Sequence, residues 1–91
     1  MAREERILRL RDEGLHWRVL ENETVVLDTT GSRYLTINAT GTLLWPLLAR
    51  GATTAQLIEA LRDTWPIPED AAARDVAEYC ALLDAEGLLR P

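Results

Sequence analysis

The chain has 91 residues, the length of one small domain, and 47% of them are hydrophobic, too large a share for a disordered chain. A single cysteine, Cys80, excludes an internal disulfide, a single histidine, His16, argues against a histidine-based zinc site, and no apolar run reaches the roughly 20 residues of a membrane helix. Residues 1–50 are neutral, with seven arginines and seven acids, whereas residues 51–91 hold three arginines against eight acids and carry the whole net charge of −5. We therefore expect one cytoplasmic domain spanning residues 1–91, with no metal, cofactor, membrane or nucleic-acid partner.

The first half of the chain has the pattern of short strands. Residues 1–14 are charge-rich, and we expect a short leading strand or a frayed turn there. Alternating and β-branched residues predict three strands, over residues 15–21, 24–28 and 33–37. Gly31 lies in the second connection and suits a hairpin turn. Two tight connections predict an antiparallel meander, in which the third strand lies at an edge.

After residue 37 the apolar period changes from 2 to 3.6, which indicates helices. The predicted helices run from a cap at Asn38 or Thr40 to Gly51, from a cap at Thr53 or Thr54 to Trp65, and over about residues 69–86. Pro46 is unfavourable inside the first of these, so that helix is expected to start late or to be kinked. Leu88 and Leu89 are expected to fold back onto the core. The fold class is therefore α+β: a three-stranded antiparallel meander followed by three helices, a winged helix-turn-helix arrangement.

Catalytic chemistry has little support in this sequence. The spacing of Cys80 with Val76 and Leu83 is typical of a core thiol, and His16 lies on a different element, so no nucleophile and base are paired. The isolated glycines form no phosphate-binding loop. We predict that the chain is not an enzyme and has no catalytic residue.

The helix-turn-helix order also suggests a winged-helix DNA-binding regulator. A helix that reads DNA needs arginine or lysine for the phosphates and base edges. The third predicted helix instead carries six acids against one basic residue, Arg74. Charge therefore argues against DNA and favours a basic or apolar peptide.

A peptide can bind such a fold by adding a strand to an open sheet edge. The third predicted strand, residues 33–37, offers that edge. Beside the core stripe of the third helix runs a second stripe, in which Tyr79 and Leu82 offer an apolar floor and Asp75, Glu78 and Glu86 an acidic rim. Spacing alone leaves two readings open: Tyr79 and Leu82 form a groove, or they complete the core.

Several motifs along the chain occur in the same order in a known family. They are Ile37-Asn38, Thr40-Gly41, Leu44-Trp45, Leu47-Leu48, Gly51-Ala52-Thr53, Asp75-Val76, Leu82-Leu83 and Glu86-Gly87-Leu88-Leu89. In this combination the chain resembles the PqqD-like family over roughly residues 15–90. Each motif alone is weak, and their order carries the resemblance.

The resemblance implies a recognition domain for the leader segments of ribosomally synthesised, post-translationally modified peptides, closest to the stand-alone leader-binding protein of lasso-peptide biosynthesis. In this family the leader adds to the third strand and lies against the third helix. The residues that the resemblance assigns to peptide binding are Arg33, Tyr34, Leu35, Thr36, Ile37, Arg74, Asp75, Glu78, Tyr79 and Leu82. For Arg74 two roles stay open, a contact with an acidic leader residue or a pair with Glu78 one helical turn later. The implied partners are the precursor leader, a transglutaminase-like leader peptidase and an asparagine-synthetase-like cyclase, and we expect a monomer.

Two neighbouring functions stay open on the sequence. The same recognition role in a radical-enzyme pathway of peptide modification would leave the same motifs. A small interaction or regulatory protein that kept the fold would leave them as well.

Overall fold

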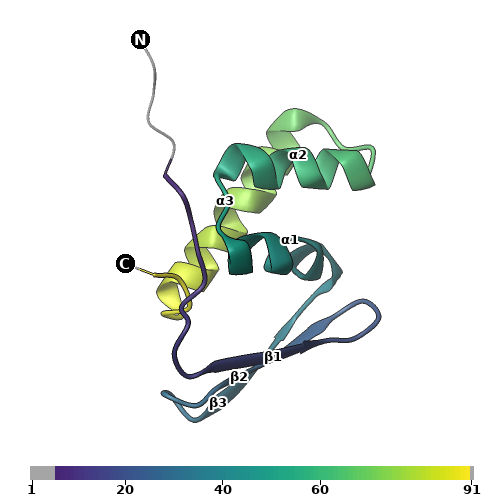
Figure 1. Cartoon of the computed structure of the whole chain (residues 1–91). Helices are drawn as coiled ribbons and strands as arrows, with labels where there is room; N and C mark the ends of the chain where they lie inside the picture. Colours follow the sequence, from purple (N-terminus) through teal and green to yellow (C-terminus); the bar gives the residue numbers. More distant parts are fainter. Residues whose placement is uncertain (1–5, 91) are drawn as a thin grey trace.

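The structure is a computed structural model, and it describes residues 6–90. Three strands precede three helices, as predicted, and Figure 1 shows all three helices on one side of the sheet. The elements are β1 (Leu15–Val19), β2 (Thr24–Asp28), β3 (Arg33–Ile37), α1 (Ala39–Arg50), α2 (Thr54–Thr64) and α3 (Glu69–Ala85). The α+β class and the order of elements are therefore confirmed.

The sheet is an antiparallel meander with the order β1-β2-β3. Val26, at its centre, pairs with Trp17 on β1 and with Leu35 on β3. Leu15, Val26 and Ile37 are buried on the face that the helices cover. Side chains alternate between faces along a strand, so the opposite face is left to solvent. As predicted, β3 is an edge strand.

The helix ends follow their capping residues. The Asn38 side chain accepts a hydrogen bond of 2.9 Å from the Gly41 N–H at the start of α1. At the start of α2, Thr53 and Gln56 form a reciprocal capping box. Gly51 follows α1 with a φ of 97°, a conformation that favours glycine. These caps agree with the predicted boundaries.

Pro46 does not delay the first helix, so of the two expected effects the late start was wrong. The α1 helix begins at Ala39 and runs through Pro46 to Arg50. Proline has no N–H, so the usual bond to the carbonyl four residues earlier, that of Thr42, is missing. The Pro46 ring is exposed, whereas Leu44, Trp45 and Leu48 are buried. Burial of the apolar face thus keeps the helix intact despite the lost bond.

The leading segment makes backbone bridges to distant parts of the chain and turns at Glu13 and Gly14 before β1. Its residues make isolated bridges, Leu8 with Ala52 and Leu10 with Leu89, and join no sheet strand. Leu10 is only 2% exposed, so it is a core residue. The segment is therefore an extended strap over the core, anchored by Leu10. Residues 1–5 of the predicted leading region lie outside the described part of the chain.

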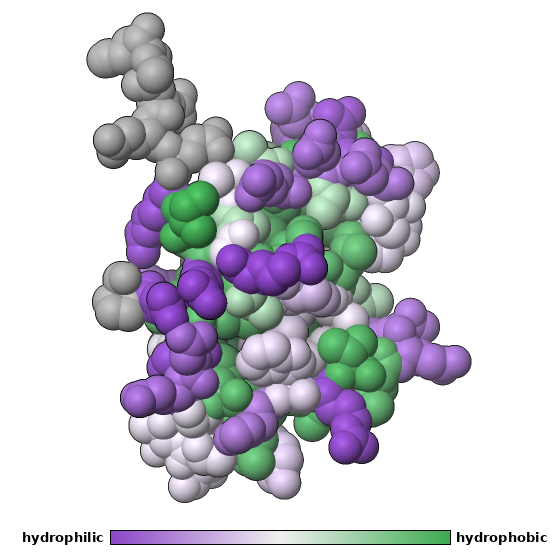
Figure 2. All heavy atoms as spheres, in the orientation of Figure 1, coloured by the Kyte–Doolittle hydropathy of each residue, from purple (hydrophilic) through white to green (hydrophobic). Residues whose placement is uncertain are grey.

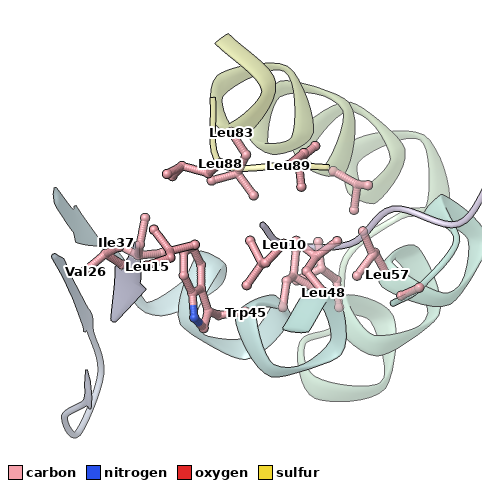
Figure 3. Close-up of a cluster of buried hydrophobic side chains, with 14 of the residues drawn as sticks. Leu10, Leu15, Val26, Ile37, Trp45, Leu48, Leu57, Leu83, Leu88 and Leu89 are labelled. Carbon is pink, nitrogen blue, oxygen red and sulfur yellow. The ribbon is translucent and has the colours of Figure 1, made fainter. Parts of the chain in front are cut away.

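The core draws on every element of the chain, as Figure 3 shows. Trp45 is fully buried, and the ring of Trp17 from β1 packs against it in a T-shaped arrangement with ring centroids 5.7 Å apart. Leu88 and Leu89 fold back onto the core as predicted. On the face seen in Figure 2, exposed apolar residues are interspersed with hydrophilic ones. Within residues 6–90, no helix is long and apolar enough to cross a membrane.

Candidate peptide-binding site

The outer edge of β3 is open. Within the described residues β3 pairs with β2 alone, so its other edge presents unpaired backbone N–H and C=O groups. Ile37 is buried and Leu35 half-buried on the helix side, whereas Tyr34 and Thr36 are exposed on the opposite side. An extended peptide can therefore extend the sheet here by backbone hydrogen bonds.

The second stripe of α3 faces the solvent. The buried residues of this helix are Ala72, Val76 and Leu83. Leu82 is 53% exposed, and Asp75 and Glu78 are exposed beside it. Tyr79 is half-buried and packs against the core. Leu82 therefore belongs to the surface, while Tyr79 is shared between the core and the surface.

A hollow of about 330 Å³ lies between α3 and the start of α1. We call it the β3–α3 hollow because Ile37, the last residue of β3, lies at Gly41 on its wall. Its lining residues are Asn38, Thr40, Gly41, Asp75, Glu78, Tyr79 and Leu82. The floor combines an aromatic ring and an exposed leucine, and the rim carries two carboxylates. Such a lining suits an apolar side chain with a basic group beside it.

Tyr79 is fixed in the hollow by its hydroxyl, which donates a 2.9 Å hydrogen bond to the Gly41 carbonyl. Burial, with a smaller contribution from the neighbouring Cys80, raises the pKa of Tyr79 above its ordinary value, so the phenol stays a donor. A side-chain carbon at Gly41 would lie 2.7 Å from Tyr79 Cε1 and closer still to an Ile37 methyl group. Glycine at this position therefore lets α1, β3 and α3 meet at the wall of the hollow.

At the start of β3, ion pairs join the strand to the end of α3. The Arg33 guanidinium reaches across from β3 to α3, where it binds the Glu86 carboxylate and backbone carbonyl. Its Nε also lies 3.3 Å from Asp28 Oδ2, and Arg11 Nη2 lies 2.7 Å from Asp28 Oδ1. One carboxylate thus joins the leading segment, the β2–β3 hairpin and, through Arg33, the end of α3.

Asp28 is an ionised group in a buried position. Burial alone raises its pKa, but hydrogen bonds from the Gly31 N–H and from Arg11 and Arg33 outweigh it, so the pKa of Asp28 is lowered from its ordinary 3.8. The side chain is nearly inaccessible and accepts backbone hydrogen bonds of 3.1 and 3.2 Å from Thr30 and Gly31. Asp28 therefore stabilises the turn between β2 and β3 through backbone hydrogen bonds, in addition to binding Arg11 and Arg33.

The structure brings together only part of the predicted site. Asp75, Glu78, Tyr79 and Leu82 line one hollow, while Arg74 is exposed on α3 and does not line it. The five predicted β3 residues divide between two faces of the sheet. Arg33, Leu35 and Ile37 point toward the helices, and Tyr34 and Thr36 point away. Within residues 6–90, Arg74 forms no ion pair with Glu78.

Sequence reasoning missed the contribution of α1 to the site. Asn38, Thr40 and Gly41 line the hollow, although the sequence pattern indicated only a helix cap there. The Thr40-Gly41 pair was the available signal, since a glycine inside a predicted first turn marks a close approach of another segment. Glu86 was expected at the rim, and it is instead paired with Arg33.

A larger hollow, of about 760 Å³, lies along α2 and its link to α3. Its lining places Arg62 among Glu59, Asp63 and Glu69 and comes from residues 53–69, whereas the lining of the β3–α3 hollow includes Asn38, which directly follows β3. Without a strand edge it offers a peptide no backbone partner. We therefore place the candidate site at the smaller β3–α3 hollow.

Groups for metal or thiol chemistry do not gather at either hollow. In the part of the chain that the structure describes, no three histidine, cysteine or acidic side chains lie close enough to hold a metal ion. Cys80 is half-buried, and burial raises the pKa of its thiol. A raised pKa disfavours the thiolate, which is the reactive form.

Comparison with protein families gives a match over most of this structure. Residues 23–89, from β2 to the segment after α3, match the family described as "Coenzyme PQQ synthesis protein D (PqqD)". The chain belongs to the PqqD family. The matched range contains both walls of the candidate site, so the site of this PqqD-family chain lies within the family's common fold. The comparison with curated proteins returns no match.

Two solved structures share the fold of this PqqD-family chain. One is described as "TbiB1 in Complex with the TbiA(beta) Leader Peptide"; it has a TM-score of 0.82 and 20% identity, over 90% of this chain and 94% of that one. The other is "Lasso peptide synthetase B1 complexed with the leader peptide", with a TM-score of 0.80 and 25% identity, over 92% of this chain and 98% of that one. Both proteins were solved with a leader peptide bound.

Proposed function

We propose that this chain binds the leader segment of a ribosomally synthesised precursor peptide. The leader adds as a fourth strand along the free edge of β3 and lies against α3 over the β3–α3 hollow. The observation that carries the proposal is the open β3 edge beside a hollow lined by Tyr79 and Leu82. Membership of the PqqD family and the leader-bound relatives support the choice of ligand.

Backbone pairing and side-chain contacts divide the work at such a site. Strand addition supplies hydrogen bonds that depend little on the leader's sequence. Selectivity then comes from the side chains that enter the hollow. An apolar leader residue fits the floor at Tyr79 and Leu82, and a lysine or arginine fits the rim at Asp75 and Glu78.

The proposed role is recognition without catalysis. A bound leader holds the rest of the precursor near the enzymes that modify it and raises its effective concentration there. For a lasso-peptide pathway these enzymes are a transglutaminase-like leader peptidase and an asparagine-synthetase-like cyclase. The likeness to a lasso peptide synthetase B1 supports this pathway over one built around a radical enzyme. The genes beside this one distinguish the two pathways directly.

The direct test is fluorescence polarisation with a labelled synthetic leader, taken from the precursor peptide encoded beside this gene. We expect saturable binding by the wild-type protein and none to a labelled DNA duplex of matched concentration, because α3 is strongly acidic. Binding of the duplex but not of the leader would support the DNA-regulator alternative and overturn the proposal.

A pair of leucine variants locates the site. Leu82→Ala removes an exposed side chain from the hollow, and we expect it to weaken leader binding about fivefold, the loss of about 1 kcal/mol of apolar burial. Leu20→Ala is the matched control, since Leu20 is similarly exposed but lies after β1, away from the hollow. Equal effects of the two changes would place the leader elsewhere. Both changes are at the surface, so circular dichroism and melting should stay close to wild type.

A further inference from the structure

The outer face of the sheet carries an apolar surface that the proposed groove does not use. All three helices lie on the opposite side (Figure 1). On this outer face the strands place His16 and Arg18 from β1, Val25 and Leu27 from β2, and Tyr34 and Thr36 from β3. Tyr34 is 73% exposed, although it is a large aromatic residue on a sheet. An exposed ring at a sheet edge is available to pack against the side chains of a further strand.

Tyr34 ends a row of side chains that crosses the sheet. The strand register pairs His16 with Leu27 and Leu27 with Tyr34. A second row runs from Arg18 through Val25 to Thr36. Side chains that stand directly opposite each other on neighbouring strands pack together, and such pairs stabilise sheets. At β3 both rows end without a neighbour in the described chain.

A strand added to β3 continues these rows. Because side chains alternate along a strand, half of those on an added leader face α3 and the other half face outward. Each outward residue then lies next to Tyr34 or Thr36. The bound leader thus supplies the side chain that covers the exposed face of Tyr34.

We infer that the leader is read on both faces of the sheet, with its outward side chains selected by Tyr34. This rests on the proposed function, and it extends the recognised part of the leader beyond the groove. The outward residue beside Tyr34 is aromatic or aliphatic, since it packs on a phenol ring next to Leu27. Apolar residues of the leader therefore occupy both faces, rather than a single stripe.

The two faces also differ in charge. The six outer-face residues named above include no carboxylate, and their basic members are His16 and Arg18. The groove side, in contrast, has the carboxylates of Asp75 and Glu78 at its rim. A basic leader residue is therefore favoured on the groove side and gains nothing on the outer side. This difference favours the register in which a basic leader residue faces α3.

The inference is tested by whether leader residues that depend on Tyr34 and those that depend on Leu82 lie an odd or an even number of positions apart. An alanine scan of the labelled leader is measured by fluorescence polarisation against the wild type, Tyr34→Thr and Leu82→Ala. Tyr34→Thr is expected to weaken binding about threefold, within the range of a cross-strand pair, while threonine keeps the strand preference. Leader residues whose effect disappears in Tyr34→Thr should lie an odd number of positions from those whose effect disappears in Leu82→Ala, because the two sets face opposite sides.

The matched control is Val19→Thr, which changes an exposed apolar strand residue at the far edge of the sheet. It should bind the leader as the wild type does. The inference is overturned if Tyr34→Thr binds as tightly as Val19→Thr, or if residues coupled to Tyr34 and to Leu82 share the same parity. Absence of leader binding by the wild type would instead overturn the proposed function. Scanning the leader against the wild type alone still shows whether one parity or both contribute, so the test does not depend on any one variant folding.

Discussion

Replacement of Gly41 by alanine tests the packing that forms the wall of the site. In an isolated helix the change is favourable, by about 1 kcal/mol at most. Here the added carbon would lie 2.7 Å from Tyr79 Cε1 and even closer to Ile37, so the ring has to move. Overpacking of this kind costs about 1–3 kcal/mol, and loss of the 2.9 Å bond from Tyr79 to the Gly41 carbonyl costs about 1 kcal/mol more.

The unfavourable contributions exceed the gain in helix propensity, so we expect Gly41→Ala to lower the free energy of unfolding by about 2 kcal/mol. For a domain of this size that corresponds to a fall in Tm of about 10 °C. Urea unfolding followed by tryptophan fluorescence measures it, since Trp45 is buried in the core. The leader should also bind more weakly, because Tyr79 lines the hollow.

Tyr79→Phe is the matched control, since it removes the hydroxyl and keeps the ring. We expect it to cost about 1 kcal/mol, clearly less than Gly41→Ala. A stabilised Gly41→Ala would mean that helix propensity decides at this position, and the argument for close packing of α1, β3 and α3 would be refuted.

Two further predictions concern charge. Leader binding should weaken as salt concentration rises, because the acidic rim at Asp75 and Glu78 is exposed and therefore screened; titrations between low and high salt that give one Kd would exclude a role for the rim. The lowered pKa of Asp28 means that its ionised form stabilises the fold above its ordinary pKa of 3.8, and that this contribution is lost as pH falls through the lower value of the folded state. Melting temperatures measured from neutral to acid pH should therefore fall less steeply at the acid end for Asp28→Asn than for the wild type. Asp84→Asn changes an exposed carboxylate and serves as the control, so its melting temperatures should follow the wild-type curve. Equal slopes for Asp28→Asn and the wild type would contradict the role assigned to Asp28.

Local patterns determined most of what the sequence could predict. The strand over residues 33–37 and the helix boundaries at Asn38, Thr53 and Gly87 depend on neighbouring residues, through alternation, caps and positive-φ glycine. The PqqD-family resemblance rested on such local motifs, and the family match over residues 23–89 confirms it.

Long-range contacts explain what the sequence could not provide. Leu10 is buried in the core and its backbone pairs with that of Leu89. No local periodicity signals a contact across almost the whole chain. Glu86 has the helical spacing of a rim residue, yet Arg33, 53 positions earlier, binds it. Whether Tyr79 was core or surface likewise depended on Gly41 on another helix.

The small size of the sheet has a consequence for the protein's lifetime. Three strands of five residues form it, and one edge of β3 is left without a neighbour. A leader that adds to this edge becomes part of the sheet. At a leader concentration one hundred times Kd, binding raises the free energy of unfolding by about 2.7 kcal/mol. Without a bound leader the protein is less stable, so it unfolds and is degraded by proteases more readily. Its abundance would follow the supply of precursor, without any dedicated regulator.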